Sequence, residues 1–233
     1  MRILIISLYL LSACQAPTER NVQIQDLASL PIELAEPDPP SFLLPPLDSG
    51  WVDLQELDST LVIDIRYATT NNFVESKMYP CARCLLRAEV AQALLFVQRK
   101  LQVKGLGLKF YDCYRPWSVQ KALWEKMPDA RYVTRPEKGS MHNRGGAVDL
   151  TIIDQHGDEL DMGTPYDFFG EEAYHTFTEL PDSILSNREL LKSTMLEAGF
   201  HHIRTEWWHY SFQKKMYELS DYQWPCPSDS VVQ

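Results

Sequence analysis

Apolar residues recur with a helical period in one long stretch of the chain, at positions 90, 91, 94, 95, 97 and 101. This spacing predicts a helix over residues 87–103. A second helix is expected over residues 116–127, because Pro116 suits the first turn of a helix. A third is expected over residues 188–198, where Gly199 would end it.

Runs rich in β-branched and aromatic residues predict strands between these helices. They cover residues 61–67, 106–111, 148–153 and 203–212. Strands and helices alternate without a regular βαβ rhythm, so the pattern favours a mixed α+β fold over a doubly wound parallel sheet. A hydrophobic share of 45% in 233 residues is enough for one well-packed domain.

The N-terminus has the pattern of an export signal. Residues 1–13 contain Arg2, an apolar run and small residues, which predicts a signal peptide. Leu-Ser-Ala-Cys, ending at Cys14, resembles a bacterial lipobox, in which the cysteine is lipidated. Gln15 follows where an Asp would indicate inner-membrane retention, so we expect a periplasmic protein anchored in the outer membrane. An ordinary secretory signal with a chance cysteine is the alternative.

The remaining chain divides by composition. Residues 14–48 are rich in proline and predict an extended tether. Residues 49–226 are expected to form the folded domain, followed by a tail over residues 227–233. The net charge of −10, without a long basic run, argues against nucleic-acid binding.

Four further cysteines lie in the expected folded domain. They are Cys81, Cys84, Cys113 and Cys226. In an oxidising periplasm they allow three full pairings, and the sequence does not choose among them. A structural bridge or buried thiols are favoured over a redox motif at Cys81 and Cys84, because the flanking sequence is not a thioredoxin-like turn.

Two short motifs indicate a metal centre. His142 and Asp149 lie in SMHNRGGAVDL, and Glu206 and His209 lie in TEWWHY. Two imidazoles and one carboxylate hold catalytic zinc with a position open for water, and a further carboxylate can act as a base. We therefore expect His142, Asp149 and His209 to bind one zinc ion per chain, with Glu206 as the general base.

The spacing of these residues has structural consequences. Gly145 and Gly146 permit a turn, so His142 can come from a loop and Asp149 from the strand behind it. Strand alternation places Glu206 opposite His209 unless the chain bends, and we expect that bend. Non-haem iron oxygenases use the same ligand types. They usually place the first histidine and the acid closer together, so zinc is favoured.

The motifs together resemble a known family. S-x-H-x-x-G-x-A-x-D and E-x-W-H are similar to the zinc D-Ala-D-Ala peptidases, a superfamily that includes hedgehog-type domains. Within it, TEWWHY, YDCYRP and MGTPYDFF resemble the D-Ala-D-Ala dipeptidases, including those associated with vancomycin resistance. The resemblance runs from about Trp51 to Trp224. It implies a single α+β domain with a central, mainly antiparallel sheet flanked by helices.

Further residue roles follow from this resemblance. It implies the zinc ligands and the base named above. Arg115 corresponds to an arginine that stabilises the tetrahedral intermediate, and Asp112 is expected to support it. Asp167 corresponds to a carboxylate that pairs with the substrate's free ammonium, and Ser140 is expected to contact substrate.

The favoured function is hydrolysis of D-Ala-D-Ala to two D-alanines by metal-activated water. The alternative is a carboxypeptidase or endopeptidase acting on peptidoglycan stem peptides, which would need an open groove. A third hypothesis, a non-catalytic zinc module, would require neither Glu206 nor Arg115. The expected partners are a small D,D-dipeptide and, through the lipid on Cys14, a membrane. The sequence predicts no oligomeric state.

Overall fold

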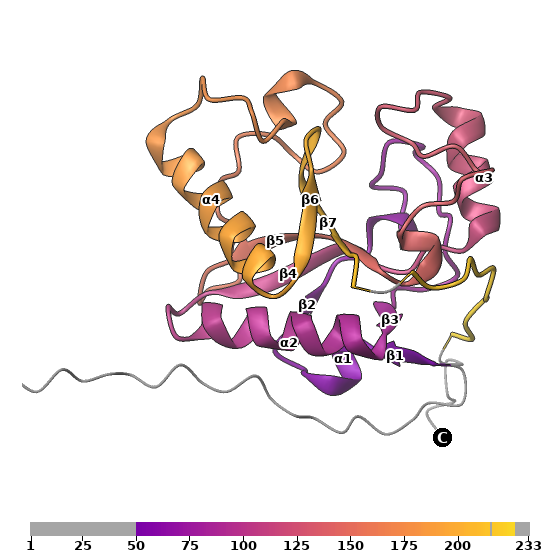
Figure 1. Cartoon of the computed structure of the whole chain (residues 1–233), viewed down its shortest axis with the longest axis horizontal. Helices are drawn as coiled ribbons and strands as arrows, with labels where there is room; N and C mark the ends of the chain where they lie inside the picture. The colour runs from indigo at the N-terminus through magenta and orange to yellow at the C-terminus, as the bar shows by residue number, and fades with distance from the viewer. Residues whose placement is uncertain (1–49, 215, 227–233) are drawn as a thin grey trace, which may run out of the picture. The chain divides into compact units, whose positions relative to one another are not determined.

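The computed structural model describes residues 50–214 and 216–226 (Figure 1). The expected signal peptide, the lipidation site at Cys14, the tether and the C-terminal tail lie outside these residues. Within the described part, no helix has the length and apolar character needed to cross a membrane.

A five-stranded sheet organises the described residues, in the order β2-β4-β5-β7-β6. These strands are β2 (Val62–Ile63), β4 (Gly107–Asp112), β5 (Ala147–Ile153), β6 (Phe200–Ile203) and β7 (Glu206–Phe212). Only the pairing of β2 with β4 is parallel within this sheet. A separate antiparallel pair joins β1 (Trp51–Asp53) to β3 (Leu85–Arg87). The expected mixed α+β class with a mainly antiparallel sheet is confirmed.

Four helices accompany the strands in the part of the chain that the structure describes. They are α1 (Leu54–Leu57), α2 (Ala88–Gln102), α3 (Trp117–Lys126) and α4 (Asp182–Glu197). One of them, α3, contributes Leu123 to the pocket described below. Short 3₁₀ turns are η2 (Arg66–Ala68), η3 (His142–Arg144) and η4 (Glu171–Ala173). The helices α2 and α4 contact each other and the sheet, while α3 lies apart from α4 (Figure 1). Every apolar position that predicted α2 is buried, so the period identified its core face correctly.

Two expected elements have different limits in the structure. The strand expected over residues 61–67 is shortened to Val62–Ile63. The chain then turns into η2, and Arg66 pairs with Asp64 at 3.0 Å. The helix expected over residues 188–198 begins earlier, at Asp182, directly after Pro181. Its first turns contain few apolar residues, so the helical period did not reveal them.

The strand expected over residues 203–212 is part of a hairpin. Ile203 ends β6, a short turn follows, and β7 begins at Glu206. The register of this pair shifts between His202 and Ile203. Such irregularities bend a strand and redirect its side chains. The bend expected near Glu206 is therefore present.

The four cysteines of the described domain form two disulfides. Cys81 pairs with Cys226, and Cys84 pairs with Cys113. The first joins the end of the described chain to the segment before β3. The second joins the residue directly before β3 to the residue directly after β4. Cross-links that close long loops restrict the unfolded chain and stabilise the fold by a few kcal/mol, on the order of 2–4 for each bridge.

Candidate active site

Three polar side chains lie side by side across the sheet. In the strand register, Asp149 of β5 faces Asp112 of β4 on one side and His209 of β7 on the other. The register of β4 and β5 shifts between Phe110 and Asp112. Bulges of this kind are common beside active sites, where they redirect a side chain. Strand pairing thus brings together residues that are far apart in the sequence.

His142 reaches this row from the loop before β5. It opens η3, which ends at Gly145 with a left-handed φ of 69°. Nδ1 of His142 donates to the carbonyl oxygen of Cys113 at 2.7 Å. The neutral imidazole then carries its lone pair on Nε2. This loop and strand placement of His142 and Asp149 agrees with the expectation from the two glycines between them.

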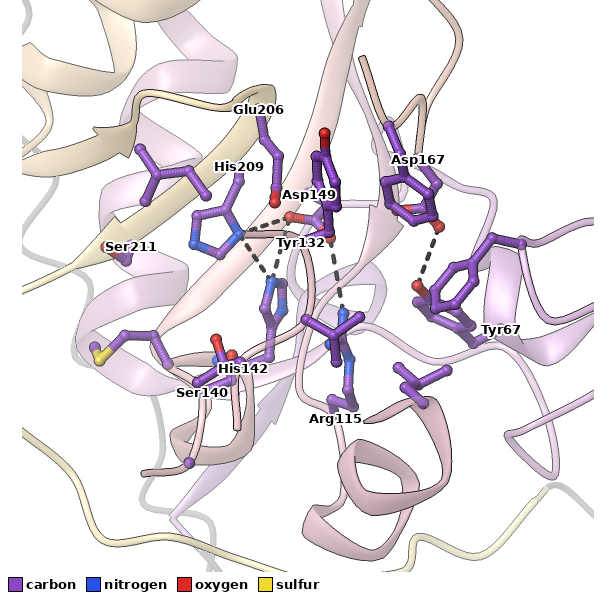
Figure 2. A pocket seen from close by; sticks show the side chains of 18 of the residues that line it. Tyr67, Arg115, Tyr132, Ser140, His142, Asp149, Asp167, Glu206, His209 and Ser211 are labelled. Atoms are coloured by element: carbon purple, nitrogen blue, oxygen red, sulfur yellow. Dashed lines mark hydrogen bonds and ion pairs between the residues drawn. The ribbon is translucent and has the colours of Figure 1, made fainter. Parts of the chain in front are cut away.

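Three donor atoms converge on one point (Figure 2). Nε2 of His142 lies 3.1 Å from Nδ1 of His209 and 3.2 Å from Oδ1 of Asp149. Nδ1 of His209 lies 2.9 Å from the same oxygen. Donors around tetrahedral zinc, with bonds of about 2.0–2.1 Å, lie about 3.3–3.4 Å apart. The three residues therefore fit a divalent metal ion after a slight opening of this triangle.

The charges in this cluster also suit a cation. Burial raises the pKa of Asp149, but the two histidines outweigh burial and hold it well below the ordinary value. Burial lowers the pKa of His209. For His142, the Asp149 carboxylate outweighs the effect of burial and raises the pKa. An ionised carboxylate beside imidazole nitrogens provides the hard and borderline donors that zinc accepts.

Glu206 lies at the start of β7 and lines the same pocket as the three donors (Figure 2). Burial, followed by the nearby charges of Asp149 and Asp167, raises its pKa well above the ordinary value. A carboxyl group with a raised pKa is suited to accept and return a proton near neutral pH.

Arg115 is held beside the cluster by two buried partners. Nε and Nη2 donate to Oδ2 of Asp112 at 3.0 and 2.7 Å. Nη1 donates to Gln120 at 3.0 Å. Nη2 also lies 4.0 Å from Oδ2 of Asp149 (Figure 2). A guanidinium has five N–H groups, so these contacts leave donors that can face the pocket.

Asp167 and Ser140 line other walls of the pocket. Asp167 accepts a hydrogen bond from the Tyr67 hydroxyl at 3.0 Å and has a left-handed φ of 57°. Burial and the charge of Asp149 raise its pKa to about 7. Ser140 is buried, and its hydroxyl accepts the backbone N–H of His142 at 3.1 Å. Each residue expected to bind metal, bind substrate or take part in catalysis is therefore in or directly beside one pocket.

The pocket is small and has an aromatic wall. Its volume is about 270 Å³. Phe73, Tyr132 and Phe169 come from three separate segments and line it near Asp167. Phe169 lies 4.8 Å from Tyr132 and 5.2 Å from Phe73 between ring centroids. These rings connect the loop after α3 with the loop before η4.

Several residues of the site were missed by sequence reasoning. The Tyr166 hydroxyl donates to Oδ2 of Asp149 at 3.0 Å. Asn143 donates to the carbonyl of Arg115 at 2.8 Å and accepts from the backbone of Ser140 at 2.7 Å. Both lie inside motifs that carried the family resemblance, next to residues singled out there. That adjacency was the available signal, since their contacts depend on distant elements.

An α+β domain with two imidazoles, three carboxyl groups and a buried guanidinium in one small pocket has the components of a metal-dependent hydrolase. Residues 48–226 match the family described as D-Ala-D-Ala dipeptidase. The chain belongs to this family. The family and the enzyme class expected from the sequence are thus confirmed.

Individual relatives agree with this assignment. A D-alanyl-D-alanine dipeptidase of Escherichia coli (strain K12) is 39% identical over 176 residues, which are 75% of this chain and 91% of that protein. One from Enterococcus faecium is 29% identical over 200 residues, 77% of this chain and 99% of that protein. A solved vancomycin-resistance D,D-pentapeptidase in complex with Zn(II) aligns at 14% identity and a TM-score of 0.36, over 55% of this chain and 73% of that one.

Proposed function

We propose that this protein hydrolyses the dipeptide D-Ala-D-Ala to two D-alanines, using a zinc ion held by His142, Asp149 and His209. Membership of the D-Ala-D-Ala dipeptidase family supports the substrate. The convergence of the three donor atoms, with separations of 2.9–3.2 Å, carries the metal assignment. When bound there, zinc would supply a Lewis acid for the scissile carbonyl and lower the pKa of its water.

Glu206 is the proposed base. Its raised pKa and its place on the pocket wall support a role in taking a proton from the attacking water and giving it to the leaving amine. The neighbouring carboxylates oppose ionisation of Glu206. A cation held by Asp149 would offset that repulsion and favour the proton-accepting form.

Arg115 and Asp167 are proposed to bind opposite charges of the substrate. The guanidinium, fixed by Asp112 and Gln120, offers N–H groups to the scissile carbonyl oxygen as negative charge develops on it. Asp167 pairs with the substrate's ammonium group. The pKa of the Asp167 carboxyl is raised to about 7, and the positive charge of the ammonium would favour its ionised form. Ser140 lines the pocket and contributes a polar surface for the substrate.

The aromatic wall favours a dipeptide over a longer peptide. Phe73, Tyr132 and Phe169 stand near Asp167, where residues preceding a dipeptide would have to extend. A stem-peptide carboxypeptidase or endopeptidase would need an open path at this point. A cavity of about 270 Å³ accommodates a small ligand more readily than a pentapeptide.

Purified protein incubated separately with D-Ala-D-Ala and with a muropeptide pentapeptide tests the substrate. We expect release of D-alanine from the dipeptide and little from the pentapeptide. Release from the pentapeptide alone would replace the proposal with the carboxypeptidase alternative.

The base is tested by Glu206→Gln, which preserves shape and removes the proton acceptor. Turnover should fall by about 100-fold or more while bound zinc is retained. Glu218→Gln, at an exposed position outside the pocket, is the matched control. Wild-type turnover in Glu206→Gln would eliminate this role.

We further propose that the protein is exported, lipidated at Cys14 and held at the outer membrane. The N-terminal pattern supports this, and two disulfides within the domain suit an oxidising compartment. Labelling with a palmitate analogue should mark the wild type and not Cys14→Ala. Equal labelling of both would contradict the anchor.

A further inference from the structure

The two oxygens of Asp149 have different surroundings. Oδ1 faces the histidines, 2.9 Å from His209 and 3.2 Å from His142. Oδ2 accepts the Tyr166 hydroxyl at 3.0 Å and lies 4.0 Å from Arg115. Only Oδ1 is therefore presented to the point where the three donors converge.

The ring of Tyr166 is held in place by two strands. It stacks on Tyr111 of β4, with ring centroids 4.8 Å apart and planes at 27°. It also meets Trp208 of β7 edge-on at 5.5 Å. Tyr111 and Trp208 are almost fully buried, with exposed fractions of 1% each. Aromatic contacts of this geometry fix the ring, and so they fix the hydroxyl at its end.

We propose that Tyr166 is a positioning residue of the metal centre: its hydroxyl engages Oδ2 of Asp149, so that the carboxylate offers Oδ1 alone to the metal. A carboxylate whose second oxygen is hydrogen-bonded cannot rotate freely into two-oxygen coordination. A metal ion held by one oxygen of Asp149 and the two imidazoles would keep a coordination place for water or substrate. The inference rests on the proposed metal site, but not on the identity of the substrate.

The location of Tyr166 gives this contact a second consequence. Asp167, the proposed partner of the substrate's ammonium, is the next residue along the chain and has a left-handed φ of 57°. The hydrogen bond from Tyr166 to Asp149 therefore anchors the same segment to the sheet. The hydrogen bond of Tyr166 therefore supports both the metal ligand Asp149 and the proposed ammonium-binding residue Asp167.

Tyr166→Phe tests the proposal, because it removes one oxygen atom and keeps the ring. Tyr210→Phe is the matched control: Tyr210 is a buried tyrosine on β7 whose hydroxyl has no hydrogen-bond partner among the described residues. Zinc affinity is measured by chelator competition. The absorption spectrum of the cobalt(II)-substituted protein reports coordination. Thermal unfolding of the metal-free proteins reports the fold.

We expect Tyr166→Phe to bind zinc about 10–100-fold more weakly and to show an altered cobalt spectrum, while Tyr210→Phe matches the wild type in both. Unchanged zinc affinity and spectrum in Tyr166→Phe would overturn the inference. So would weaker binding with an unaltered spectrum and a lower unfolding temperature of the metal-free variant, since Tyr166 would then be structural. A wild type that binds zinc without cleaving D-Ala-D-Ala would refute the proposed substrate and leave this inference intact.

Discussion

Asp112 binds Arg115 through a single oxygen, with Nε at 3.0 Å and Nη2 at 2.7 Å from Oδ2. The other oxygen accepts the Tyr79 hydroxyl at 2.8 Å and the backbone N–H of Cys113 at 3.0 Å. Four hydrogen bonds thus fix a fully buried carboxylate. Its orientation determines where the guanidinium points.

The first prediction concerns this pair. Asp112→Asn leaves the buried Arg115 without its counter-charge, so the free energy of unfolding should fall by about 3–5 kcal/mol, and kcat should fall as well. Urea unfolding and steady-state kinetics measure the two effects. Asp129→Asn, which alters an exposed Asp–Arg pair at the surface, is the control and should change neither. Full activity and stability of Asp112→Asn would show that Arg115 is oriented by other contacts.

Removal of metal is the second test. Chelation should abolish turnover, and added zinc should restore it. Zinc that binds only the folded chain stabilises it by about 4 kcal/mol when free zinc exceeds Kd by about 1,000-fold. His209→Ala should lose both the activity and the zinc-dependent rise in Tm. Undiminished turnover in dialysed protein under strong chelation would contradict the metal site.

Substrate length is the third test. Tyr132→Ala removes one ring of the aromatic wall, so activity on a tripeptide ending in D-Ala-D-Ala should rise relative to the dipeptide by about tenfold or more. Tyr132→Phe keeps the ring and its contact with Phe169, and removes only the hydroxyl. It should retain the preference for the dipeptide. If the kcat/KM ratio of the two substrates is the same in Tyr132→Ala and wild type, the wall does not set length.

The fourth prediction concerns the pH dependence of stability and a histidine that is not a metal ligand. Burial, reinforced by the nearby His202, lowers the pKa of His175 to about 3. An unfolded histidine has a pKa of about 6.5. Between these values the unfolded chain binds a proton that the folded chain does not, so stability falls as pH decreases below about 6.5. Above that pH this contribution is fully present.

His175→Gln should therefore lose less stability than the wild type between pH 7 and pH 5. Urea midpoints at both values measure the difference, with the exposed His156→Gln as control. Parallel pH profiles for wild type and His175→Gln would show that His175 does not cause the acid sensitivity.

The sequence was sufficient to predict the elements with strong periodic patterns and the residues with distinctive chemistry. The helix α2 was recognised because its core face repeats at 3.6 residues. His142, Asp149 and His209 stood out because few other roles require two imidazoles and a carboxylate in such motifs. Their convergence depends on strand register, and it was expected from the residue types and the family resemblance, not from the spacing of the motifs.

Other features depended on contacts that no local pattern encodes. The strand expected over residues 61–67 ends at Ile63 because the chain turns there, and the pattern of side chains gave no sign of that turn. The bond from Tyr166 to Asp149 requires a loop to fold back over β5. The contact between Tyr132 and Phe169 joins the loop after α3 to the loop before η4. Periodicity reports which face of an element is buried, not which distant residue it meets.

Cys113 makes two different contacts, one through its backbone and one through its side chain. Its carbonyl orients the imidazole of His142, and its sulfur is bonded to Cys84. Reduction of the Cys84–Cys113 disulfide would loosen the segment whose carbonyl orients His142. Metal binding and activity would then depend on whether the protein is in an oxidising or a reducing environment. Metal content before and after mild thiol treatment measures this dependence.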